Sequence, residues 1–189
     1  MLRKVMFTLC SSVLVLLIGA MPAQARDRFV DTDDYKEGDY DKGIIEDYSD
    51  LVEGDGVEWV YLAPGVSLND YTIRIGEIKN VSDITNRSML EAAEDTFAAA
   101  LKRKGNDGRK GTLNAETAVY WAERASAGKR WIPYAGAHLA QSGVGIEMIL
   151  RDSSGKIVAK IRHSGRQGDD LEDAAEEVAD EIVDFISDN

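Results

Sequence analysis

The chain has 189 residues, of which 34 are acidic and 22 are basic, and its formal net charge at pH 7 is −12. A chain this acidic repels phosphate backbones and anionic lipids, which argues against nucleic-acid binding and against electrostatic docking on membranes. The single cysteine excludes an intramolecular disulfide, and the length is sufficient for one ordinary hydrophobic core.

Residues 1–25 are predicted to be a secretory signal peptide. Residues 3–4 are basic, residues 5–18 are mainly apolar, and residues 23–25 read Ala-Gln-Ala, an A-x-A cleavage site. Cleavage would leave 20 basic and 34 acidic residues, a net charge of −14. A retained membrane anchor is the alternative, because residues 5–24 are uncharged and a bilayer span needs roughly 20 residues. We expect a periplasmic or extracellular protein, with association with the outer membrane as an alternative.

Residues 26–42 are predicted to be an acidic, mobile lead, because they carry too few apolar side chains to offset the entropy of ordering. A single domain is expected over residues 43–189. Its first side chains worth burying are Ile44, Ile45, Tyr48 and Leu51.

The first half of this domain contains two predicted strands and a helix. Residues 58–62 form the first strand, which the Ala-Pro-Gly sequence at 63–65 ends. Residues 71–76 alternate apolar and polar side chains, as a half-buried strand does. Ser88 and Glu91 predict a capping box at the start of a helix, and Lys102–Lys104 fall in its last turn, next to the negative end of the helix dipole.

The second half contains three predicted strands and a helix. In the strand expected over 117–125, period-two alternation places Val119, Trp121 and Glu123 on one face and Tyr120 and Ala122 on the other. Residues 143–152 and 156–163 alternate as a hairpin around Gly155. A last amphipathic helix begins after Asp169 or Asp170.

The element order is therefore β-β-α-β-β-β-α. Two helices with one apolar stripe each need one sheet face to cover. The prediction is an α+β fold of two layers, a largely antiparallel five-stranded sheet with both helices on one face. The other face, or a sheet edge, would be free to meet a partner.

Candidate chemistry is sparse. His138 and His163 are the only histidines and no ligand-spaced cluster surrounds them, so no metal site is predicted. The adjacent His163 and Ser164 would point to opposite faces of a strand. Glu123 and Glu147 are the two carboxylates that merit testing as catalytic acids, with the solvent-facing side of a sheet as the competing interpretation. No catalytic residue and no cofactor is predicted.

One segment stands out as a partner surface. Trp131, Ile132, Tyr134 and Leu139 lie in a stretch without helical or strand period. Amphipathic aromatic residues of this kind are enriched at interfaces. The alternative is that they cover an open end of the core.

Three motifs together resemble a family of Gram-negative envelope proteins of unknown function, most of them lipoproteins. The motifs are a G-F-L-x-D-Y-S-x-L-like opening, a Y-x-x-P-G…Y strand motif and a late G-x-G-x-x-E-x-x-L-x-D…G motif. They read here as Gly43-Ile44-Ile45-Glu46-Asp47-Tyr48-Ser49-Asp50-Leu51, as Tyr61-Leu62-Ala63-Pro64-Gly65 with Tyr71, and as Gly143, Gly145, Glu147, Leu150, Asp152 and Gly155. The resemblance covers about residues 43–188 and implies an extracytoplasmic domain with no known activity. The A-x-A site replaces the family's lipobox, which puts lipid anchoring in doubt.

The sequence thus predicts a non-enzymatic module that binds a protein partner or assembly at the cell envelope. The alternative is a hydrolase acting on envelope glycan through carboxylates such as Glu123 and Glu147.

Overall fold

The computed structural model describes residues 43–104, 108–126 and 140–189. The predicted signal peptide and acidic lead lie outside the described residues. The elements in chain order are β1 (Val52–Glu53), β2 (Trp59–Leu62), a 3₁₀ turn η1 (Leu68–Asp70), β3 (Thr72–Ile75), β4 (Lys79–Asn80), α1 (Arg87–Lys104), β5 (Thr112–Glu123), β6 (Ser142–Arg151), β7 (Ile157–Gln167) and α3 (Leu171–Asp188).

The strands form one mixed sheet in the order β1-β2-β7-β6-β5-β3, with β4 also paired to β5. All pairs are antiparallel except β3–β5 and β4–β5, which are parallel. The predicted α+β class and the largely antiparallel sheet are confirmed, but the sheet has seven strands and not five. The two additional strands, β1 and β4, span two residues each, which is too short for a period-two pattern to reveal.

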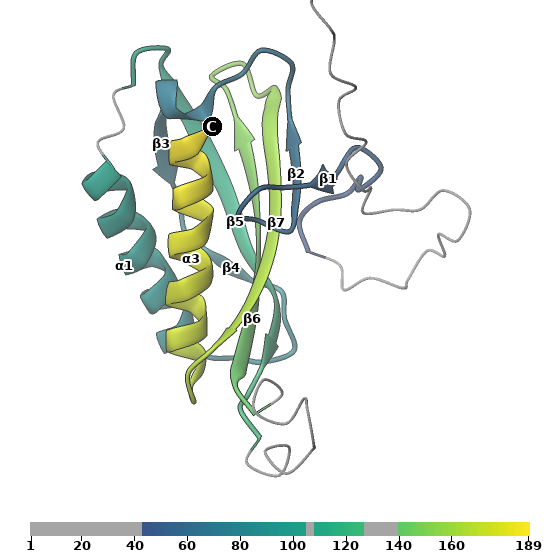
Figure 1. Cartoon of the computed structure of the whole chain (residues 1–189), viewed down its shortest axis with the longest axis vertical. Coiled ribbons are helices and arrows are strands. Elements are labelled where there is room, and N and C mark those ends of the chain that lie inside the picture. The colour runs from purple at the N-terminus through teal and green to yellow at the C-terminus, as the bar shows by residue number, and fades with distance from the viewer. Residues whose placement is uncertain (1–42, 105–107, 127–139) are drawn as a thin grey trace, which may run out of the picture.

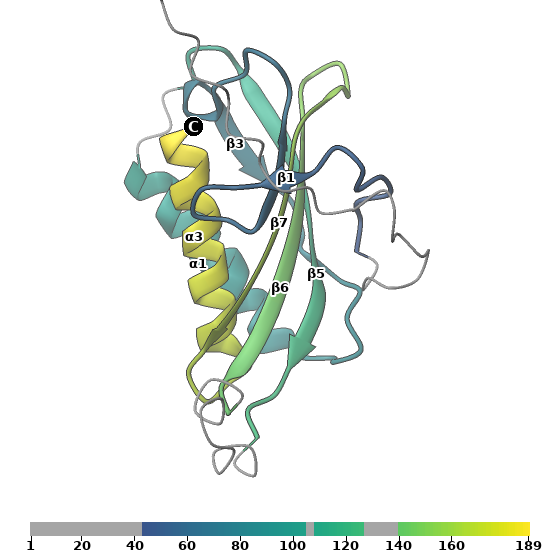
Figure 2. The ribbon, with the colours of Figure 1, turned by 45° about the vertical axis from the view of Figure 1, so that its right-hand side comes forward.

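Both helices cover the same side of the sheet, here called the helix face (Figures 1 and 2). The two helices run in the same direction, as two contacts between them show. Ser88 at the start of α1 bonds Glu172 at the start of α3, and Lys104 at the end of α1 pairs with Asp184 near the end of α3. The predicted apolar side of the hairpin is confirmed, since Val144, Ile146, Met148 and Leu150 are all fully buried in the core against the helices.

The residues that cap the N-termini of α1 and α3 were predicted with different success. The predicted Ser88–Glu91 capping box is wrong: Asn86 Oδ1 accepts the Met89 N–H at 3.1 Å, while Glu91 pairs with Arg87 on the surface. Asn86, two residues before Ser88, offers the same kind of acceptor, and the two capping patterns overlap in sequence. Asp170 caps α3 as predicted, accepting the Asp173 N–H at 2.9 Å.

A bulge in β5 changes which side chains share a face. The pairing of β5 with β6 shifts between Val119 and Trp121. Val119 packs in the core on the helix face, whereas Trp121 lies over Gly143 on the opposite face, here called the outer face. The prediction that Val119, Trp121 and Glu123 share one face is therefore wrong, since an extra residue reverses the alternation beyond it.

The outer face is not entirely free. Residues 43–51, here called the cover segment, pack across part of it and form a second, smaller core. In this core Ile45, Tyr48 and Leu51 are buried against Ile149 of β6, as the early apolar residues were predicted to be. The expectation of a wholly free sheet face is therefore wrong, since residues 43–51 cover part of it.

Candidate functional site

The most unusual group in the described structure is a fully buried carboxylate on the outer face. Glu147, in the middle of β6, has no exposed side-chain surface. Its Oε2 accepts the backbone N–H groups of Ile44 at 2.6 Å and Ile45 at 2.9 Å. Its Oε1 accepts the Tyr48 hydroxyl at 3.0 Å and the Arg162 guanidinium. Four donors therefore satisfy a charge that burial would otherwise penalise heavily.

Arg162 lies opposite Glu147 on β7, in direct register. Its guanidinium carbon is 3.6 Å from the centroid of the Tyr120 ring and 5.4 Å from that of Tyr48. Burial raises the pKa of both phenols, that of Tyr120 to about 12, and the neighbouring Glu147 charge raises the pKa of Tyr48 further. Both hydroxyls thus stay protonated, and Tyr48 can donate to the carboxylate.

The cover segment fits this carboxylate closely. A Cβ added to Gly43 would lie 1.9 Å from Glu147 Oε2, so only glycine allows the chain to approach. At the other end of the segment, the Lys160 ammonium donates to the Asp47 carbonyl at 2.8 Å and to both oxygens of the Asp50 carboxylate at 2.9 Å. The segment is fixed to the sheet at two points.

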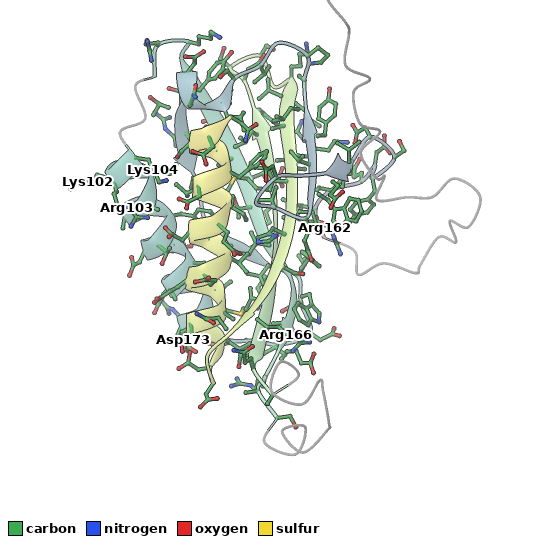
Figure 3. All side chains as sticks on the ribbon, viewed as in Figure 1. Lys102, Arg103, Lys104, Arg162, Arg166 and Asp173 are labelled. Carbon is green, nitrogen blue, oxygen red and sulfur yellow. The ribbon has the colours of Figure 1, made fainter. Side chains whose placement is uncertain are left out.

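A second unit of similar composition lies four residues further along β7. Arg166 pairs with Glu123 of β5 and lies 4.9 Å from the centroid of the Trp121 ring. The Trp121 ring crosses over Gly143 of β6, where a Cβ would come within 2.4 Å of it. Figure 3 labels both arginines, Arg162 above Arg166 along β7. The side chains of Glu123 and Arg166 remain 33% and 17% exposed, so this unit is accessible.

The structure is similar to a PelC variant solved as a dodecamer from Paraburkholderia phytofirmans. The match has 14% identity and a TM-score of 0.44, and it covers 68% of this chain and 94% of that one. At this distance the likeness transfers no residue, ligand or activity. No protein-family model and no curated protein matches the chain. The family resemblance of the three sequence motifs therefore stays a prediction.

The two candidate carboxylates have different environments. Glu123 lies on the outer face and is partly exposed, as its solvent-facing interpretation predicted. The same interpretation is wrong for Glu147, because the cover segment seals it. Glu123 is level with Gly143, four residues from Glu147, which separates the two positions by about 13 Å along the strand. Glycosidase carboxyl pairs are about 5–9.5 Å apart, so the geometry does not favour such a pair.

The remaining predicted site residues fall into two groups. His163 and Ser164 point to opposite faces as predicted: the His163 ring bonds Glu181 of α3 at 2.6 Å, and Ser164 donates to Glu58 at 2.9 Å. His138 and the predicted partner surface of Trp131, Ile132, Tyr134 and Leu139 lie outside the described residues.

The described ranges hold neither a cluster of metal ligands nor a membrane-spanning helix. Residues 43–104, 108–126 and 140–189 contain no group of three or more His, Cys, Asp or Glu side chains that could hold a metal ion. Within these ranges no helix is both long and apolar enough to cross a membrane.

Sequence reasoning missed the two arginines that organise the outer face. A signal was available, since Lys160, Arg162, Ser164 and Arg166 occupy alternate positions of β7, which places them all on one face. Gly143 and Gly145, alternating on β6, make room for the rings of Trp121 and Tyr120. Together these two patterns predict a polar, aromatic sheet face.

Proposed function

We propose that the chain is a non-enzymatic module of the cell envelope that binds a protein partner through the uncovered part of its outer face. The proposed contact surface, here called the open unit, consists of Trp121, Glu123 and Arg166. The observation that carries the proposal is the position of the Trp121 ring, laid over Gly143 and flanked by an arginine–glutamate pair on a partly exposed sheet.

Residue types and preorganisation support this surface. Trp and Arg are enriched at the residues that contribute most to binding energy in protein interfaces. The ring and the guanidinium are already held in place, which lowers the entropy that a partner would have to offset. The predicted aromatic segment with Trp131 and Tyr134 follows β5 in sequence and stays part of the proposal.

The rival hydrolase has less support. A catalytic acid must reach substrate, and Glu147 is sealed by four donors beneath the cover segment. Glu123 pairs with Arg166 and lies about 13 Å along the strand from the position of Glu147, farther than the two carboxyl groups of a glycosidase. Secretion to the envelope rests on the predicted signal peptide.

The proposal can be tested by photo-cross-linking in cells that secrete the full chain. A photoreactive amino acid replaces Glu123, and a matched control replaces Glu91, an exposed acid on α1. We expect a discrete adduct from position 123 only. Trp121→Ala should abolish it, and so should Gly143→Ala, whose Cβ displaces the ring, while the urea midpoint of each variant verifies folding.

Two results would overturn the proposal. One is the absence of any adduct specific to position 123, and the other is an adduct that persists in folded Trp121→Ala and Arg166→Ala variants. For the rival function, a folded Glu123→Gln variant that reproduces the phenotype of a deletion strain, yet still co-purifies with the cross-linked partner, would favour catalysis. Trp131→Ala with Tyr134→Ala tests whether the predicted segment contributes.

A further inference from the structure

A groove lies between the edge strand β3 and the helix α1, which do not pack tightly against each other there. β3 is the terminal strand on the side of the sheet below α1, and the groove between them has a volume of about 510 Å³. Its apolar lining comes from Ile73 and Ile75 of β3 and from Ala98 and Leu101 of α1. Figure 1 shows α1 as the outermost element on that side. The corner has the dimensions of a ligand site.

The backbone of β3 offers hydrogen bonds toward this groove. The Thr72 N–H donates to the Gly111 carbonyl at 2.9 Å, so Thr72 and Arg74 direct their backbone groups toward β5. Successive residues of a strand alternate, and the N–H and C=O groups of Ile73 and Ile75 therefore point away from the sheet. Such an unpaired edge is a template for another strand.

Side chains along the same edge favour an apolar neighbour. Ile73 is buried, whereas Ile75 and Leu101 are only half-buried at the groove. Further along, Val81 continues the pairing of β4 by donating its N–H to the Val119 carbonyl at 2.9 Å. Val81 is 45% exposed, the one exposed large hydrophobic side chain among the described residues. An added strand would cover apolar surface at both places.

The negative charge of the groove favours an incoming strand that carries a basic residue. Its charged lining residues are Glu77 and Glu94, and Glu94 also accepts the Ile78 N–H at 3.2 Å. Two carboxylates beside an apolar slot attract a lysine or arginine at the end of the incoming strand. A second copy of this chain, with its net charge of −12, is a poor match.

We infer that the β3 edge receives an extended segment of another protein, which adds a strand to the sheet beneath α1. The segment carries apolar side chains at alternate positions, which enter the groove, and a basic residue that reaches Glu77 and Glu94. This surface is separate from the open unit on the outer face, so the two proposals can fail independently. Strand addition of this kind gains affinity from backbone bonds and specificity from alternate side chains.

The test uses an amidated eight-residue peptide in which Val and Thr alternate between two terminal Lys residues, added to the full mature chain. Amide hydrogen exchange is followed by NMR. Without peptide, the Ile73 and Ile75 amides should exchange faster than those of Thr72 and Arg74. With saturating peptide, we expect the exchange of the first pair to slow by about tenfold or more.

Matched variants on α1 separate the groove from the rest of the surface. Ala98 lines the groove and Ala99 does not, although both are exposed. Ala98→Arg fills the slot and neutralises its carboxylates, and should weaken peptide binding by about tenfold or more. Ala99→Arg adds the same charge one residue away and should change binding by less than about twofold.

Three outcomes would overturn the inference. The peptide could leave the Ile73 and Ile75 amides unprotected, or both arginine variants could weaken binding equally. Alternatively, the chain could self-associate in a concentration series without peptide, with Ala98→Arg preventing it, which would identify a second copy as the occupant.

A control peptide tests the backbone bonds. A peptide N-methylated at alternate residues should bind more weakly than the parent peptide, since it lacks N–H donors for the β3 edge.

Discussion

The outer face contains two units built from the same parts. In one, Arg162 pairs with Glu147 and stacks on Tyr120, whose ring lies over Gly145. In the other, Arg166 pairs with Glu123 and lies against Trp121, whose ring lies over Gly143. The cover segment seals the first unit, here called the sealed unit, and leaves the open unit accessible.

The difference teaches that chemical identity does not decide the role of an ion pair. A fully buried pair needs its lone pairs satisfied, and the cover segment supplies three of the four donors to Glu147, so we expect loss of either partner of the sealed unit to destabilise the domain. A partly exposed pair contributes little to stability because water screens it, so the open unit is available for recognition. The following predictions test this contrast, beginning with the largest expected effect.

Glu147→Gln should destabilise the protein most. It removes the Glu147 charge that pairs with the buried Arg162 guanidinium, and breaking a buried pair costs about 3–5 kcal/mol. Urea unfolding followed by circular dichroism measures the loss. A change below about 1 kcal/mol would contradict the structural role of the sealed unit.

The second prediction concerns alkaline pH. The pKa of Tyr120 is raised to about 12, so the folded protein keeps this proton after the unfolded chain starts to lose it near pH 10. The corresponding stabilisation is complete below pH 10 and is lost as pH rises through about 12. The free energy of unfolding that is lost over this pH range is about 2–3 kcal/mol. Urea unfolding at a series of pH values should show a smaller alkaline loss in Tyr120→Phe than in the parent chain.

Gly43→Ala should weaken the attachment of the cover segment. The added Cβ collides with the Glu147 carboxylate, which its four donors hold in place, and overpacking of this kind costs about 1–3 kcal/mol. Gly76→Ala is the control, since its Cβ would meet nothing closer than 4.0 Å. Equal urea midpoints for the two variants would show that the close approach at Gly43 has no energetic weight.

Glu123→Gln should have the smallest effect. The pair with Arg166 is partly exposed, and such pairs contribute less than about 1 kcal/mol. Its urea midpoint should therefore stay close to that of the parent chain, in contrast to Glu147→Gln. A loss as large as that of Glu147→Gln would mean that the open unit is structural too.

Periodicity predicted much of the fold. The alternation of Val144, Ile146, Met148 and Leu150 and the glycine turn at 155 identified the hairpin, and Asp170 identified the start of α3. Period-two reasoning failed at Tyr120, because one inserted residue reverses every later side chain and leaves no mark in composition. β1 and β4 were not predicted, because a strand of two residues is too short to show an alternating pattern.

The environment of Glu147 could not be predicted for a different reason. A polar residue within an alternating strand is normally on the solvent side, and Glu147 does lie on the side away from the helices. What seals it is a segment about a hundred residues earlier, brought there by tertiary structure alone. Gly43 is evident in the sequence, but the reason for a glycine there is its close approach to Glu147, which local sequence patterns do not reveal.

The attachment of the cover segment also constrains the order of folding. The bond between Ile44 and Glu147 joins residues 103 positions apart, and that between Lys160 and Asp47 joins residues 113 apart. Closing loops of this length is slow, and Glu147 and Arg162 become neighbours only when β6 and β7 have paired. We expect residues 43–51 to dock last. The first residues of the domain thus complete its assembly, and their protection from proteolysis reports that the final hairpin has formed.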